Sequence, residues 1–146
     1  MAFRFSLESV LHLRESVERS EELVLQQISQ EIGRVENEIQ TLETMQGSLR
    51  EKRDHDLSLG MHASHLREWN EQEARIVISI RNFREQLRQL EISKRKQLAI
   101  LQSARLDREL LSKLREGRHR SYKREQLRQE QKMLDDLFLA QLIAKR

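Results

Sequence analysis

The stretch that decides the fold is Leu66–Leu111, LREWNEQEARIVISIRNFREQLRQLEISKRKQLAILQSARLDRELL. Steps of three and four residues alternate through it without a break, and ten of the fourteen positions they reach are apolar. A 3.5-residue repeat keeps one narrow side of a helix against a partner helix along its whole length. The stretch therefore predicts a long helix of a coiled coil. The fourteen positions are Leu66, Trp69, Glu73, Ile76, Ile80, Phe83, Leu87, Leu90, Lys94, Gln97, Leu101, Ala104, Arg108 and Leu111.

A similar stripe precedes this stretch and predicts a first helix over about residues 6–57. Its alternation is interrupted between Ser20 and Ile32 by three successive steps of four residues. We interpret these steps as stutters that relax the supercoil locally. The members of the stripe are Val10, Leu13, Val17, Ser20, Val24, Ile28, Ile32, Val35, Ile39, Leu42, Gln46 and Leu49.

A turn over about residues 58–64 is expected to separate the two helices. The apolar pattern fails between Lys52 and Ser64, and Gly60 can supply the positive φ that a tight turn needs. A short connection makes the two helices antiparallel. The second helix, over about 65–142, is longer than the first, so residues 116–146 are expected to extend beyond it as a basic, amphipathic overhang. We therefore predict an all-α fold: one coiled-coil domain over residues 1–146, a long antiparallel two-helix hairpin with an extended C-terminal helix.

The composition argues against an enzyme. The 146 residues include no Cys, so no disulfide or thiolate ligand is possible, and aromatic residues make up only 4%. A hairpin buries a seam and leaves little room for a substrate cavity. We expect no catalytic activity and no cofactor. The opening residues 1–5 lack the apolar region of a signal peptide, and no run approaches the ~18 apolar residues of a membrane span.

Positive charge gathers in the predicted overhang. Residues 115–132 hold seven Lys and Arg against three Glu, so this segment carries +4 and the rest of the chain −1. Such a segment can contact nucleic acid phosphates or an acidic protein surface, or it can be a solvated helix end. Tyr122 is its only aromatic residue, which gives bases little to stack on, so we favour a protein partner and expect no nucleic acid. Apolar residues follow and predict a binding surface: Leu127, Leu134, Leu137, Phe138, Leu142 and Ile143.

Several polar residues admit a structural or a functional interpretation. Glu73, Lys94, Gln97 and Arg108 fall on the predicted seam, where such residues often fix register and partner choice. For Lys94 and Arg108 we favour the interpretation that their long stems carry the charge out to solvent. At the turn, His62 and His65 could face Asp54, His55 and Asp56. We favour a solvated hairpin tip there and expect no metal site.

Two stretches of the chain resemble the flagellar export protein FliJ family. Phe3-Arg-Phe-Ser-Leu7, followed by Val10-Leu-His-Leu-Arg-Glu15, is similar to the opening of that family, and Glu130-Gln-Lys-Met-Leu-Asp-Asp136 is similar to its late signature. The resemblance implies a component of the flagellar type III export apparatus, cytoplasmic and peripherally associated with the cytoplasmic face of the inner membrane. It also implies a coiled coil similar to the central stalk of rotary ATP synthases. The implied partners are the hexameric flagellar export ATPase, the cytoplasmic domain of the export gate, and substrate chaperones.

The resemblance also implies two sets of contact residues. The end that holds both termini is expected to bind the ATPase ring, and Leu134, Leu137 and Phe138 are expected to add apolar contacts. The half nearer the turn is expected to bind the export gate, where Met45 and Trp69 are the best candidates. The candidates for the ring are Leu13, Arg14, Glu15, Glu18, Arg118, Arg120, Lys123, Arg124, Arg128, Lys132, Asp135 and Asp136. The candidates for the gate are Glu38, Leu42, Met45, Leu49, Trp69, Gln72, Ile76 and Phe83.

Alternative functions stay open at this point. The chain could be a basic coiled-coil adaptor that binds nucleic acid or another helix bundle, or a homo-oligomer joined through its C-terminal stripe. It could also be the equivalent stalk of a virulence type III secretion system.

Overall fold

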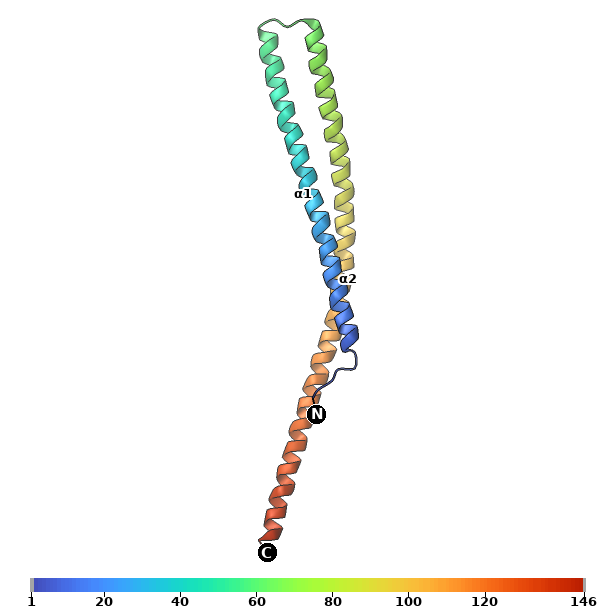
Figure 1. The fold of residues 1–146 in the computed structure, drawn as a ribbon, viewed down its shortest axis with the longest axis vertical. Helices are drawn as coiled ribbons and strands as arrows, with labels where there is room; N and C mark the ends of the chain where they lie inside the picture. Colours follow the sequence, from blue (N-terminus) through green and yellow to red (C-terminus); the bar gives the residue numbers. More distant parts are fainter. Residues whose placement is uncertain (1, 146) are drawn as a thin grey trace. The chain divides into compact units, whose positions relative to one another are not determined.

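Two long helices make up nearly all of the structure (Figure 1). A computed structural model describes residues 2–145, in which α1 spans Glu8–Ser58 and α2 spans Ala63–Ala144. The helices have 51 and 82 residues, and residues 2–145 contain no strand. No proline interrupts either helix, and residues with high helix propensity fill both. The prediction of an all-α antiparallel hairpin with an extended C-terminal helix is confirmed.

The chain divides into two compact units, and each is described by itself. We call residues 21–100 the hairpin unit, and residues 1–20 together with 101–146 the terminal unit. Both helices contribute residues to both units, and the two chain termini belong to the terminal unit.

The hairpin unit contains the turn between the helices. Gly60 has a φ of 86°, a backbone conformation that residues with a Cβ rarely adopt, so the predicted role of this glycine is confirmed. Its N–H donates a hydrogen bond to the carbonyl of Leu57 at 3.2 Å, which closes the end of α1. Ile32, Val35 and Ile80 are buried between the two antiparallel helices of this unit. The short turn and this apolar seam together make the unit a coiled-coil hairpin.

The predicted seam of α2 is confirmed along its whole length. Each of the fourteen positions from Leu66 to Leu111 is buried or half-buried. Leu101 is 2% exposed and Ala104 is 7% exposed, so the terminal unit also has an apolar seam. The heptad rule therefore identified which side of α2 faces α1.

The predicted seam of α1 is wrong over its first third. Leu11 is 4% exposed, whereas its neighbours Val10 and Leu13 are 38% and 61% exposed. The side that faces α2 advances in alternating steps of three and four residues with no stutter. Polar residues occupy part of this side, so the apolar pattern alone did not identify it. Its positions from Leu11 to Asp56 are Leu11, Arg14, Glu18, Glu21, Leu25, Ile28, Ile32, Val35, Ile39, Leu42, Gln46, Leu49, Arg53 and Asp56.

Candidate functional site

A polar seam joins α1 and α2 in the terminal unit. The Glu18 side chain is only 14% exposed, and Arg108 donates a hydrogen bond from Nε to its carboxylate at 2.7 Å. Arg105 lies 3.4 Å from the same carboxylate. The hydrogen bond from Arg108 is the main reason that the pKa of Glu18 is lowered. Glu18, a candidate for ring binding, is thus held by groups of its own chain, and the expectation that Arg108 extends to solvent is wrong.

Two further ion pairs link the helices of this unit. A guanidinium nitrogen of Arg14 lies 3.5 Å from a carboxylate oxygen of Asp107, and Nε of Arg115 lies 2.9 Å from a carboxylate oxygen of Glu8. Glu15, another ring candidate, lies 3.6 Å from Nδ1 of His12 on its own helix. These exposed pairs add little stability but favour one register of the two helices.

The segment before α1 packs on α2. The ring of Phe3 meets the rings of His119 and Tyr122, with centroids 4.9 and 5.4 Å apart. Phe5 is buried, and the guanidinium of Arg118 lies 5.5 Å from its ring centroid. Contact between the N-terminal segment and α2 therefore reaches Tyr122, beyond residue 116 where the overhang was predicted to begin.

The rest of α2 is a helix with water on every side. Every residue from 123 to 145 is exposed. Arg128 pairs with Glu125 at 2.8 Å, and Gln131 donates to Asp135 at 3.1 Å, so these contacts stay within the helix. All ring candidates from Arg120 to Asp136 lie on this exposed helix or just before it.

The end of this helix is apolar around most of its circumference. Residues 133–143 read MLDDLFLAQLI, in which only Asp135, Asp136 and Gln141 are polar. At 3.6 residues per turn the apolar side chains point in nearly every direction, so they cannot all face one flat surface. The large ones are 48% to 73% exposed: Met133, Leu134, Leu137, Phe138, Leu139, Leu142 and Ile143. A helix with this pattern is normally enclosed by its surroundings.

A groove in the hairpin unit collects most of the predicted gate residues. Its volume is about 350 Å³, and five of the eight gate candidates line it. Met45 is 51% exposed at its edge, and Trp69 is half-buried. The remaining lining residues add small hydroxyls and one cation. The groove is lined by Thr44, Met45, Ser48, Leu49, Lys52, Trp69, Gln72 and Ile76.

Comparison with known protein families gives one match of nearly full length. The family described as "Flagellar FliJ protein" matches residues 3–146. The chain belongs to the FliJ family. The protein is therefore a component of flagellar type III protein export, and the FliJ family is a non-catalytic part of that system. No curated protein and no solved structure matches the chain.

The other three gate candidates lie outside the groove. Leu42 and Phe83 are half-buried positions of the seam, and Glu38 is exposed on α1. The structure therefore brings together Met45, Leu49, Trp69, Gln72 and Ile76 and leaves three candidates apart.

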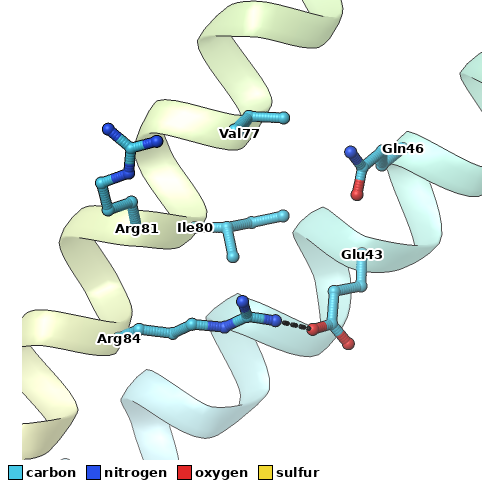
Figure 2. Close-up of a pocket in the computed structure, with 6 residues that line it drawn as sticks. All are labelled: Glu43, Gln46, Val77, Ile80, Arg81 and Arg84. Carbon is cyan, nitrogen blue, oxygen red and sulfur yellow. Dashed lines mark hydrogen bonds and ion pairs between the residues drawn. The ribbon is translucent and has the colours of Figure 1, made fainter.

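A second groove of about 430 Å³ lies farther along the hairpin unit (Figure 2). Figure 2 shows Arg84 of α2 reaching the carboxylate of Glu43 on α1, with 2.9 Å between Nη2 and Oε1. Ile80 lies at the base of the groove and is 5% exposed, while Val77 is 38% exposed at its side. The side chains of Arg84 and Glu43 are 64% and 49% exposed, so the ion pair helps to fix the register of the helices more than it adds stability.

Within residues 2–145 no three His, Cys, Asp or Glu side chains are placed to bind a metal ion. None of the helices described combines the length and the apolar character that crossing a bilayer requires.

Sequence reasoning missed one surface of the terminal unit. Val10, Leu13 and Val17 were assigned to the seam, but they are 38%, 61% and 36% exposed. The sequence did contain a signal for this surface. The three successive steps of four residues between Ser20 and Ile32 mark the point where the apolar row passes from one side of the helix to another.

Proposed function

We propose that the protein is a stalk of the flagellar export ATPase: a coiled coil that binds the hexameric ATPase ring, connects it to the export gate and takes part in chaperone recycling. The observation that carries the proposal is the exposed helix at residues 123–145, apolar around most of its circumference at its end. A ring can cover such a helix on every side at once, which a flat or grooved partner cannot. Membership of the FliJ family supports the same assignment.

Charge supports an acidic ring entrance. Before the apolar end, α2 carries the exposed cations Arg120, Lys123, Arg124, Arg128 and Lys132. Positive charge on a docking helix increases the encounter rate and fixes orientation more than it raises affinity. Arg118 differs, because its guanidinium also donates to the Ser6 hydroxyl at 2.9 Å and lies over the Phe5 ring. We therefore assign Arg118 to holding the N-terminal segment as well.

A triple charge reversal tests the ring proposal. The variant R120E/K123E/R124E is expected to lose most binding to the export ATPase, together with ATPase stimulation, because an acidic entrance would repel it. The matched control is R67E/R75E/R81E, which reverses three exposed arginines of the hairpin unit. Both variants are expected to keep helical circular dichroism. Equal ATPase binding by both variants would contradict the proposal.

We further propose that the groove containing Met45 and Trp69 contacts the export gate. Its apolar base and polar rim have the composition of a small protein-binding site. The variant Met45→Glu is expected to weaken binding to the cytoplasmic domain of the gate by about tenfold, because the bound gate would remove water from a carboxylate at the edge of the groove. The control is Ile78→Glu, which changes a residue of similar exposure outside the groove. Binding that Met45→Glu leaves intact would remove this assignment.

Location and chaperone binding are proposed from the family alone. The proposed location is the cytoplasmic face of the inner membrane, reached through the ATPase and the gate. Cell fractionation with and without the gate protein tests this location. A pull-down with export chaperones tests the chaperone role.

The basic helix leaves nucleic acid binding as the alternative to test. Tyr122 is the only aromatic residue of the basic segment 115–132, and its ring already contacts that of Phe3, so this segment offers a base no other Phe, Tyr or Trp ring. A gel-shift assay with duplex DNA at micromolar protein is expected to show no complex at physiological salt. A salt-dependent shift would favour the alternative.

A further inference from the structure

We propose that the N-terminal segment, residues 2–7, is a latch that controls how much of α2 is covered by α1. While the latch is closed, residues 8–20 pack on α2, and the stretch of α2 that is exposed at every residue is 123–145. When the latch opens, residues 8–20 separate from α2 as one piece, and the free stretch of α2 begins near residue 104. The seam of the hairpin unit stays closed in both states.

Aromatic rings fasten the latch to α2 (Figure 1). Phe5 is 7% exposed beneath the guanidinium of Arg118, and Phe3 is half-buried, with the guanidinium of Arg115 6.0 Å from its ring centroid. The carbonyl of Phe5 also accepts a hydrogen bond from the N–H of Glu8 at 3.1 Å. This bond ties the latch to the first turn of α1, so the position of the latch determines where α1 begins on α2.

The start of α1 has little apolar contact of its own. Within residues 8–20 only Leu11 is buried, and the half-buried side chains are Glu8, Glu15 and Glu18. Phe5 and Leu11 are therefore the two buried side chains of residues 2–20. Because apolar burial is the main stabilising contribution in packing, a large part of what holds this end of α1 resides in the latch.

Ion pairs provide the remaining contacts between residues 8–20 and α2. The pairs of Glu8 with Arg115 and of Arg14 with Asp107 join side chains that are 39% to 46% exposed. Exposed pairs of this kind add little net stability, and salt weakens them, since the screening length falls from ~10 Å at 0.1 M to ~3 Å at 1 M. Without the latch, this end of α1 is thus held weakly and in a salt-dependent way.

The hairpin unit has a different seam, which limits how far the opening can extend. From residue 25 to residue 42 the side of α1 that faces α2 is apolar at every position, and each of these side chains is buried or half-buried. Salt does not screen apolar contacts as it screens ion pairs. Separation of α1 from α2 should therefore stop near residue 20. The apolar positions are Leu25, Ile28, Ile32, Val35, Ile39 and Leu42.

Opening would lengthen the part of α2 that a partner can surround. Ala104 is 7% exposed and lies one turn before Arg108, which bonds Glu18, so separation of residues 8–20 would expose Ala104. The helix newly freed is 104–122, about 28 Å long at ~1.5 Å per residue. This consequence rests on the proposed function: a ring that encloses 123–145 could enclose a longer stretch of α2 when the latch is open.

Amide hydrogen exchange of the full-length protein tests the latch. In the variant F3A/F5A, amides of residues 8–20 are expected to exchange at least about tenfold faster, while those of residues 25–42 change little. The control Phe138→Ala removes a ring that is 61% exposed, and it is expected to leave both regions unchanged. Both variants are expected to keep helical circular dichroism. Faster exchange confined to the first turn of α1, or equal acceleration in residues 25–42, would overturn the proposal.

Thiol labelling reports the opening from the side of α2. The chain has no Cys, so A104C supplies a single thiol. Adding F3A/F5A to A104C is expected to speed maleimide labelling by about tenfold, whereas adding F138A is expected to leave it unchanged. Raising sodium chloride from about 0.1 M to about 1 M is also expected to speed labelling of A104C. Labelling that F3A/F5A leaves unchanged would overturn the latch, and labelling that salt leaves unchanged would overturn the role given to the ion pairs.

These measurements use the protein alone, so the latch and the stalk function can fail separately. Unchanged ATPase binding by R120E/K123E/R124E would remove the stalk function and would not affect the exchange of residues 8–20. Unchanged labelling of A104C in the F3A/F5A background would remove the latch and would leave the stalk function as it is.

Discussion

Gln97 offers a sharp test of what polar residues do in this seam. Its side chain is only 7% exposed, and Nε2 donates to the backbone carbonyl of Glu21 at 3.0 Å and to the Glu21 carboxylate. Replacing Gln97 by Leu removes both hydrogen bonds, worth about 1 kcal/mol for the carbonyl and about 1.5–3 kcal/mol for the charged carboxylate. The carbonyl of Glu21 keeps its bond within α1, and a buried Leu contributes about 1.5–3 kcal/mol. The apolar gain offsets most of the lost hydrogen bonding, so we expect Gln97→Leu to cost only about 1 kcal/mol.

The partner variant Gln97→Ala separates the two contributions. It removes the same hydrogen bonds and supplies little apolar burial, so a loss of about 3–4 kcal/mol is expected. Urea unfolding followed by circular dichroism at 222 nm measures both variants. Each kcal/mol corresponds to about 2–4 °C in the midpoint of thermal unfolding. A Gln97→Leu variant that loses as much stability as Gln97→Ala would refute the reasoning, because the hydrogen bonds would then be essential to the seam.

Four further predictions concern the seam, the turn and the N-terminal segment. The pKa of Glu18 is lowered from 4.5, so the ionised carboxylate stabilises the folded protein above pH 4.5, and this stabilisation is lost as the pH falls through the folded-state pKa. The free energy of unfolding of Glu18→Gln, measured across the same acid range, should therefore fall less than that of the unchanged protein. Leu101→Ala should cost about 2–5 kcal/mol in urea unfolding, because Leu101 is 2% exposed. Gly60→Ala should cost about 1–2 kcal/mol, since a Cβ is strained at a φ of 86°, and Gly60→Asn should cost less. Phe5→Ala should leave circular dichroism nearly unchanged and speed amide hydrogen exchange around Arg118, where the ring now packs.

The side of α2 that faces α1 could be predicted from the sequence because most of its seam positions are apolar. Leu66–Leu111 repeats every 3.5 residues, and the four polar positions it contains did not disturb the pattern. The same reasoning failed in α1, where Glu18 and Glu21 face α2 while Val10 and Leu13 face water. A rule that equates apolar with buried selects the wrong side of a helix wherever the seam is polar and the outside is not.

The N-terminal segment shows a second limit of sequence reasoning. Phe3 packs on Tyr122, which is far away in the sequence, and a helical repeat of apolar residues cannot predict such a contact. The family resemblance supplied the gate candidates, and five of them prove to share one groove. Spacing alone could not have given that groove, because it depends on the register between α1 and α2, which pairs such as Arg84 with Glu43 help to set.

The helix from 123 to 145 has a consequence for how this protein can change over evolutionary time. Its side chains are exposed throughout, so the folding free energy of the molecule depends little on their identity. Substitutions there do not lower the free energy of unfolding in the way that most substitutions in a packed interior do. Under the proposed function, divergence along this stretch is limited by the ring that binds the helix, and the two proteins can change together while the sequence of the hairpin stays the same.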